Sequence, residues 1–353
     1  MPRTPRFLAP WVGQPNAGSA IYHCISRTVD RAPLFGEQEK EQFVRLMRLY
    51  ERFCGVHVLT YSVMSNHFHI LLEVPPRPKE ELSDEELCER LAVLYKEGFV
   101  EEVRESLIRF RERGDEAGRE RLRESFLYRR WNLSEFMKTL KQRFSKWFNK
   151  RHDRKGTLWE ERFKNPLVEA GYGARKVAAY IDLNPIRAGI VDQPEDYRWC
   201  GYAEAVAGCS EARDGIERVM NGFERAKGGE QGPARTWSQI ASAYRVILFT
   251  DGEERLQKDP VSGRVEVARR GISREEVEKV LARGGTLSAG QMLRCRVRAM
   301  TDGLVIGTES FVEKVFQAKR EYFGPKRRSG SRPIHRCETD LCCARALRKD
   351  ALG

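Results

Sequence analysis

The chain has 353 residues, of which 41% are hydrophobic and 32% charged, and its 63 Lys and Arg outnumber its 51 Asp and Glu. This length predicts two domains, or one core with large additions. The net charge of +12 favours a polyanionic partner, and a basic surface without such a partner is the alternative. Since no run of about 18 apolar residues occurs, the sequence excludes a membrane-spanning protein, and its composition excludes collagen, coiled-coil and fully disordered chains.

Nine cysteines are scattered along the chain, and the first 19 residues lack the apolar stretch of a secretory signal. The number of cysteines is odd and no regular spacing relates them. We therefore expect reduced thiols and a cytoplasmic protein.

The first part of the chain predicts a flexible arm, then a strand, a helix and a pair of strands. The arm spans residues 1–19. Residues 20–29 are rich in β-branched and aromatic side chains, which favours a strand. Residues 37–54 repeat their apolar side chains at helical spacing and precede a glycine, as an amphipathic helix does. Two strands, 55–64 and 66–74, then follow around a tight turn, and prolines end the second strand.

The middle of the chain predicts a charged insertion within one domain that spans residues 20–205. Residues 77–130 hold 13 basic and 15 acidic residues, which predicts helices with opposite charges along their faces. A second amphipathic helix is expected at 133–150 and one or two strands at 156–170. Residues 172–184 predict a third helix, which a proline stops.

The last part of the chain predicts a linker, a second domain and a tail. Residues 206–235 are rich in Gly, Ala, Glu and Arg, which is typical of a linker. Residues 236–323 predict a small, separate, mostly helical domain. Residues 324–353 carry an excess of basic residues and are expected to be an extended tail.

Two histidines stand out in the segment SNHFHILLEV. Side chains alternate along a strand, so His67 and His69 share one face, and Phe68 and Ile70 point to the other. Two imidazoles on one strand can bind a single divalent cation. Two histidines with no role beyond packing and hydrogen bonding are the alternative. Neither the H-x-H-x-D-H pattern of zinc hydrolases nor a second H-x-[ST] element is present.

The helix at 172–184 supplies two further candidates. Tyr180 and Asn184 lie four residues apart and therefore share one helical face. Val177 and Ile181 are placed to pack this helix onto the sheet. In one interpretation the tyrosine lies beside the metal and the asparagine supplies an oxygen ligand. In the other, the tyrosine packs and the asparagine is a polar helix end.

Three ordered motifs resemble the single-tyrosine HUH transposases, and most of all the REP-associated tyrosine transposases with their IS200-like domain. The motifs are YHCISRTVDRAPLF, YSVMSNHFHILLEV and YIDLNPIRAGIVDQPEDYRWCGY. The similar stretches are about 20–75 and 131–205. The resemblance implies an α+β fold, in which helices pack on a ferredoxin-like antiparallel sheet. It also implies a cytoplasmic, nucleoid-associated protein that acts as a monomer or homodimer on single-stranded or hairpin DNA with REP-like palindromes.

The resemblance also implies the chemical roles of four residues. Tyr180 would be the nucleophile, and His67, His69 and Asn184 would bind Mg²⁺ or Mn²⁺. Glu73 shares the histidine face and is expected to contact a histidine N–H group beside the metal site. The basic residues around 131–170, and one beyond the tyrosine helix, are expected to contact DNA: Lys138, Lys141, Arg143, Arg154, Lys155, Arg162, Lys164 and Arg187.

The implied reaction is cleavage and rejoining of single-stranded DNA. A phenol with an ordinary pKa near 10 is a weak nucleophile at pH 7. A divalent cation on the scissile phosphate withdraws charge and orients phosphorus for in-line attack. The tyrosine oxygen then displaces a 3′-OH group and leaves a 5′-phosphotyrosine link, which a 3′-OH group can reverse without ATP.

Two other functions are left open by the sequence. One is a domesticated protein that binds DNA hairpins without turnover. The other is a metal-dependent nuclease that uses water as its nucleophile, for which Tyr180 would be dispensable.

Overall fold

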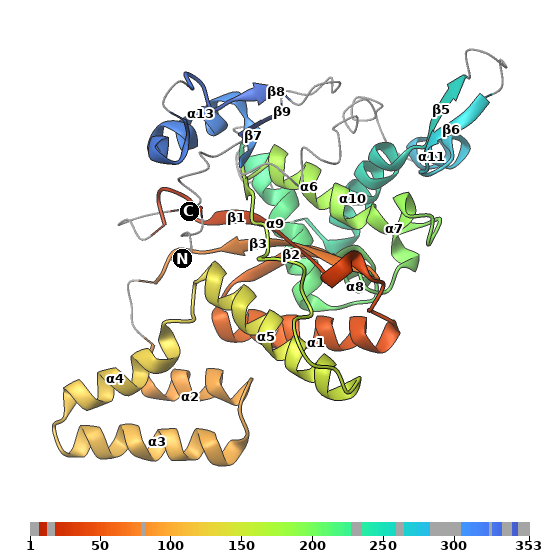
Figure 1. The fold of residues 1–353 in the computed structure, drawn as a ribbon. Helices are drawn as coiled ribbons and strands as arrows, with labels where there is room; N and C mark the ends of the chain where they lie inside the picture. The colour runs from red at the N-terminus through yellow and green to blue at the C-terminus, as the bar shows by residue number, and fades with distance from the viewer. Residues whose placement is uncertain are drawn as a thin grey trace.

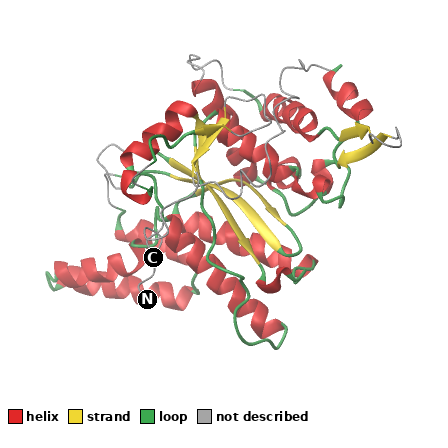
Figure 2. Ribbon diagram, turned by 45° about the horizontal axis from the view of Figure 1, so that its top comes forward, coloured by secondary structure: helices red, strands yellow, loops and turns green. Residues whose placement is uncertain are grey.

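The computed structural model describes residues 7–12, 18–78, 82–226, 235–258, 265–282, 305–324, 327–333 and 341–344. Within them, a seven-stranded sheet with the order β2-β3-β1-β4-β7-β9-β8 forms the centre, and helices cover both of its faces (Figures 1 and 2). The strands are β1 (Ala20–Arg27), β2 (His57–Val63), β3 (His67–Val74), β4 (Leu167–Val168), β7 (Val305–Thr308), β8 (Arg332–Pro333) and β9 (Leu341–Ala344).

The first four strands have the ferredoxin-like arrangement that we expected. β1 lies between β3 and β4 and is antiparallel to both, and β2 is antiparallel to β3. Helix α1 (Glu37–Cys54) connects β1 to β2, and α5 (Leu133–Arg151) precedes β4. β1, α1 and β2 thus form a split βαβ unit with β3 inserted between its strands. The chain has an α+β fold.

Side-chain alternation in β3 separates two cores. Phe68, Ile70 and Leu72 point into the core beneath α1 and α5. Leu71 points into the other core, which contains α6 (Tyr172–Asp182) and α9 (Ser210–Ala226). Each of these side chains is fully buried, and burial of one such side chain is worth about 1.5–3 kcal/mol. A shift of one residue in register would exchange the two faces, so both cores fix the position of the histidines.

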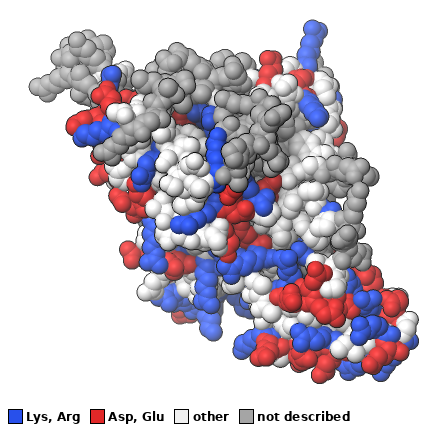
Figure 3. All heavy atoms as spheres, turned by 180° about the vertical axis from the view of Figure 1, so that it is seen from behind, with Lys and Arg blue, Asp and Glu red and all other residues white. Residues whose placement is uncertain are grey.

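The helices of the insertion lie where the charge pattern predicts them. They are α2 (Asp84–Ala92), α3 (Glu97–Glu112) and α4 (Glu116–Leu127), and they extend away from the sheet in Figure 1. Charges of both signs cover their surface in Figure 3. Asp84 accepts a hydrogen bond from Arg119 at 2.9 Å and another from Arg123, which ties α2 to α4.

The expected linker at 206–235 is wrong, because α9 occupies most of it and packs against β2. Gly215 explains both the prediction and its failure. A Cβ atom there would lie 2.5 Å from the carbonyl oxygen of Leu59, so only glycine permits this close approach of helix and strand. A glycine that resembles a linker residue in the sequence is a packing residue in the fold.

The expected separate domain at 236–323 is also wrong. Helix α10 (Trp237–Gly252) packs on α6 and α9, and β7 pairs parallel with β4 through Leu167 and Val305. The described part of 236–323 thus shares the sheet and both cores. It also contains the hairpin strands β5 (Arg255–Lys258) and β6 (Val265–Arg269) and the helices α11 (Arg274–Leu281) and α13 (Glu309–Ala318).

Described residues near both ends of the chain pack on the core or pair with the sheet, where we expected an arm and a tail. Phe7 and Ala9 are buried, and the Ala9 N–H group donates a hydrogen bond to the Tyr22 hydroxyl at 2.9 Å. β8 and β9 continue the sheet beyond β7. Residues 1–6 and 13–17 of the expected arm, and 325–326, 334–340 and 345–353 of the expected tail, lie outside the described residues.

Two short helices follow α6, namely α7 (Asn184–Arg187) and α8 (Gly201–Val206). Of the helices that the structure describes, none combines the length and the apolar character required to cross a bilayer.

Candidate active site

The two histidines of the H-x-H motif lie side by side at the start of β3. Their ring centroids are 5.1 Å apart. His67 pairs with Arg27 of β1, and His69 pairs with Ile25 of β1 and Ser62 of β2. His69 therefore lies between two neighbouring strands and is only 3% exposed, whereas His67 at the strand end is partly open to solvent.

Helix α6 brings Tyr180 to these histidines. The Tyr180 ring is buried, and it lies edge-on to the His69 ring with 5.8 Å between the centroids. The neighbouring apolar residues Val177 and Ile181 pack the helix into the same core as Leu71. Three of the four residues expected in the site therefore form one cluster, although Tyr180 lies more than 100 positions after the two histidines in the sequence.

His23 is a fourth member of the cluster, which our sequence analysis missed. Its Nε2 atom lies 2.9 Å from Nδ1 of His69, and the two rings stack with their centroids 5.0 Å apart. Its ring centroid is also 6.1 Å from that of Tyr180. Alternation in β1 could have placed His23 on one face, but the pairing of His23 with Leu71 depends on a strand register that the sequence does not reveal.

Both expected histidine ligands are held in the neutral form. Burial, followed by the charge of Arg27, lowers the pKa of His67 to about 4. Burial lowers the pKa of His69 well below its ordinary value, and the neighbouring His23 and His67 lower it further. Neutral imidazole is the form that binds a metal ion.

Hydrogen bonds at Nδ1 leave the other nitrogen of each ring for a ligand. His67 Nδ1 lies 2.7 Å from Oδ1 of Asn66, whose Nδ2 donates to the carbonyl of Arg31 at 3.0 Å. Oδ1 is therefore the acceptor, His67 carries its proton on Nδ1, and Nε2 keeps its lone pair. Nδ1 of His69 lies against Nε2 of His23, and this contact leaves Nε2 of His69 for a ligand when the shared proton is on His69 Nδ1. Such partners orient the histidines of metal sites.

Asn184 lies at the start of α7, one helical turn beyond Tyr180. Its Nδ2 atom donates to the carbonyl oxygens of Tyr180 at 3.1 Å and Ile181 at 3.4 Å. These bonds direct the amide nitrogen toward the helix and leave Oδ1 as the atom that could reach a cation. Among the described residues, no hydrogen bond joins Asn184 to either His67 or His69.

The donor set fits a divalent cation with open coordination positions. The described part of the chain contains no group of three or more His, Cys, Asp or Glu side chains placed to hold a metal. Two neutral imidazoles therefore need oxygen ligands from an amide, water or substrate. Asn184 offers an amide oxygen at the start of α7, directly after the helix that carries Tyr180, and the remaining positions would be available to phosphate oxygens.

Arg187 places a positive charge beside the tyrosine. Its guanidinium lies over the Tyr180 ring, 4.9 Å from the centroid, and its Nη1 atom donates to the Tyr180 carbonyl at 3.3 Å. Of the expected DNA contacts, this is the one that the structure places against the tyrosine.

Glu73 has a different partner from the one we expected. Its carboxylate accepts a hydrogen bond from Arg218 of α9 at 3.4 Å. Glu73 lies four residues beyond His69 in the strand, a separation of about 13 Å at 3.3 Å per residue. Asn66 and His23 take the place beside the histidines that we had assigned to Glu73.

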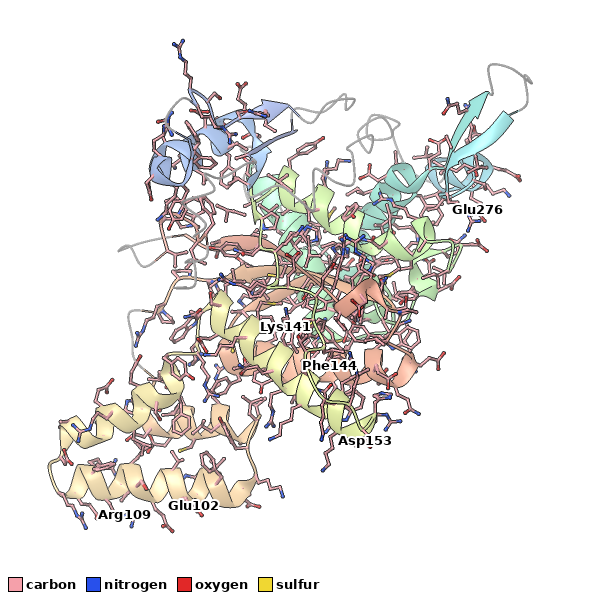
Figure 4. The ribbon with its side chains drawn as sticks, in the orientation of Figure 1. Glu102, Arg109, Lys141, Phe144, Asp153 and Glu276 are labelled. Atoms are coloured by element: carbon pink, nitrogen blue, oxygen red, sulfur yellow. The ribbon has the colours of Figure 1, made fainter. Side chains whose placement is uncertain are left out.

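The expected DNA contacts on α5 lie across the sheet from Tyr180. The apolar face of α5, which includes Phe144 in Figure 4, belongs to the core on the α1 side. Lys138 pairs with Glu135 at 3.1 Å, and Lys141 donates to the hydroxyl of Ser26 at 2.8 Å. The remaining residues of this group lie on α5 or in the segment after it and are exposed or half-buried: Arg143, Arg154, Lys155, Arg162 and Lys164.

A family comparison matches part of this site. Residues 16–84 match the family described as "Transposase IS200 like". The match covers β1, α1, β2 and β3, and therefore includes His23, His67 and His69 but not Tyr180. A search of curated proteins gave no match.

A comparison with solved structures found a REP-associated tyrosine transposase bound to a REP hairpin. The identity is 13% and the TM-score 0.32, and the similarity covers 59% of this chain and 87% of that chain. The resemblance that the sequence predicts is confirmed for the segment that carries the histidines: residues 16–84 are similar to IS200-like transposases.

Proposed function

We propose that this protein is a metal-dependent transposase that cleaves and rejoins single-stranded DNA beside REP-like hairpins through a phosphotyrosine link to Tyr180. The observation that carries the proposal is the contact of the Tyr180 ring with His69, beside His67, in a segment similar to IS200-like transposases. We infer single-stranded or hairpin DNA as the partner, bound by a monomer or a homodimer.

His67, His69 and Asn184 would hold Mg²⁺ or Mn²⁺ in this proposal. When bound, the cation would neutralise charge on the scissile phosphate and polarise it for attack. His23 and Asn66 keep the two imidazole rings in position through their contacts with Nδ1. The lowered pKa values of the imidazoles keep both rings neutral and able to act as ligands at neutral pH.

Tyr180 would perform the covalent step. Its hydroxyl oxygen forms a bond to phosphorus as the bond from phosphorus to the 3′ oxygen breaks. The phenol gives up one proton and the 3′ oxygen takes up one, so the leaving strand ends in a 3′-OH group. A free 3′-OH group then attacks the phosphotyrosine and releases the tyrosine, so the number of phosphoester bonds is unchanged. Arg187 over the ring would stabilise negative charge on the phenolic oxygen and on the phosphate joined to it.

A gel assay tests this proposal. A labelled hairpin oligonucleotide with single-stranded flanks is incubated with the protein and Mn²⁺ or Mg²⁺ and separated under denaturing conditions. We expect a labelled covalent band that is lost in Tyr180→Phe and after chelation. The matched control is Tyr172→Phe, which removes a hydroxyl from the same helix and should keep the band.

Two outcomes would replace the proposal by one of its alternatives. Cleavage that survives Tyr180→Phe would indicate a nuclease in which water attacks. Tight binding of the hairpin without any cleavage, in either metal, would indicate a DNA-binding protein without turnover.

A further inference from the structure

A cavity of about 310 Å³ lies where the charged insertion meets α1 and α5. We call it the insertion pocket. Its volume is at the lower end of the range for small-molecule sites. It is lined by side chains from four parts of the chain that include Tyr50, Tyr95, Arg129, Gln142, Arg143 and Lys146.

The insertion pocket is cationic and has no carboxylate in its lining. In the part of the chain that the structure describes, Arg129, Arg143 and Lys146 form no ion pair. Basic residues nearby differ in this respect, because Lys138 pairs with Glu135 on the same helix. Three uncompensated cations around one cavity favour an anionic ligand.

Arg129 shows how the pocket is built. Its Nη1 atom donates to the hydroxyl of Tyr95 at 3.0 Å, and its guanidinium lies 4.6 Å from the ring centroid of Phe53. These contacts fix the side chain, while its buried Nε–H group has no hydrogen-bond partner among the described residues. A guanidinium that is fixed in this way in the lining of a cavity is suited to a phosphate oxygen.

The other groups in the lining suit a strand of nucleotides. Tyr95 stacks on Phe99 at 4.7 Å and presents a rigid ring beside the cations, and Gln142 adds an exposed amide. Aromatic rings beside Lys and Arg are the features with which proteins bind single-stranded nucleic acid. The exposed positions of Arg143 and Lys146 allow the chain of phosphates to pass across the mouth.

We propose that the insertion pocket binds the phosphate backbone of the DNA substrate, so that the junction of the insertion with α1 and α5 is a second DNA-contact surface. This inference rests on the proposed function, which supplies DNA as the ligand. The pocket lies on the α1 and α5 side of the sheet, whereas Tyr180 lies on the α6 side. The pocket therefore contributes affinity without taking part in strand cleavage.

A binding experiment on the full chain tests the inference. Fluorescence anisotropy of a labelled hairpin oligonucleotide with single-stranded flanks is measured with Tyr180→Phe protein, without added metal, at several salt concentrations. Loss of two phosphate contacts in Arg143→Ala/Lys146→Ala should lower the salt slope by about 1.4–1.8, and the affinity about tenfold at 0.15 M salt. The control Arg109→Ala/Arg111→Ala removes the same charge from exposed positions on α3, and Figure 4 places Arg109 far from α5.

Each outcome decides the inference separately from the proposed function. Weaker binding by the pocket variant alone supports it. An equal loss in both variants, no loss in either, or no DNA binding by the parent protein overturns it, as does pocket dependence seen only with RNA of the same sequence. The covalent band in the gel assay tests the proposed function independently, because the anisotropy experiment involves no cleavage.

Discussion

Replacing Lys176 by methionine tests whether the C-terminal region and the tyrosine helix form one folded unit. Lys176 of α6 donates from Nζ to both carboxylate oxygens of Asp251 in α10, each at 2.8 Å. The two side chains are 1% and 0% exposed. Lys176→Met would leave the Asp251 carboxylate buried without its direct partner. Removing one member of a buried ion pair costs about 3–5 kcal/mol, so we expect a loss of this size in the free energy of unfolding.

The pH dependence of that loss provides a second check. Burial holds the pKa of Asp251 above its ordinary value even with Lys176 present. A carboxyl group with a raised pKa contributes stability that is complete below its unfolded pKa and declines as the pH rises through its folded pKa. Without Lys176 this pKa rises further, so the variant should be destabilised more at pH 8 than at pH 5.

Urea unfolding followed by circular dichroism measures these effects. The double variant Lys176→Met/Asp251→Asn should be more stable than Lys176→Met, because no unpaired charge stays buried. Lys279→Met is the control, since the ion pair of Lys279 with Glu275 is exposed and its loss should leave the stability nearly unchanged. A loss below about 1 kcal/mol for Lys176→Met, or two separate unfolding transitions, would refute the reasoning.

Three further predictions concern the metal, the histidine contact and the packing of α9. Mn²⁺ at about one hundred times its Kd should stabilise the protein by about 2.7 kcal/mol in thermal unfolding. His67→Ala or His69→Ala should abolish this stabilisation. If the stabilisation is unchanged in both variants, the two histidines are not ligands of the metal. His23→Ala should weaken Mn²⁺ binding about 10–100-fold in calorimetry, since His23 holds the His69 ring, and unaltered affinity would show that the contact is only structural. Gly215→Ala should cost at least about 1–3 kcal/mol in urea unfolding, because its Cβ would lie 2.5 Å from a carbonyl oxygen, whereas Gly98→Ala, with no atom within 4 Å, should be neutral or stabilising.

Local patterns predicted the elements around the site well. The expected helix at 37–54 has the observed bounds, and the second amphipathic helix differs by one residue. Alternation also assigned His67 and His69 to one face of β3, opposite Phe68. These features depend on side chains close together in the sequence, where spacing determines which face a residue occupies.

Long-range pairing could not be predicted in the same way. The contact of His23 with His69 depends on how β1 aligns with β3, and no pattern within either strand sets that register. β7 is four residues long and pairs with β4, which has only two residues and lies far earlier in the chain. Gly215, which permits α9 to approach β2, suggested a linker. Composition alone does not distinguish a glycine in a flexible linker from a glycine at a close helix–strand contact.

The packing of α10 against the tyrosine helix also determines the shortest fragment of this protein that can be expected to be active. Tyr244 of α10 donates its hydroxyl proton to Asp182, two residues from Tyr180, and that carboxylate is completely buried. A chain shortened to end near residue 205 would keep every residue that we assign to metal binding and nucleophilic attack. It would nevertheless expose to water one side of the helix that holds the nucleophile. A chain that folds and acts on its own must therefore include α10, although the similarity to the transposase family ends at residue 84.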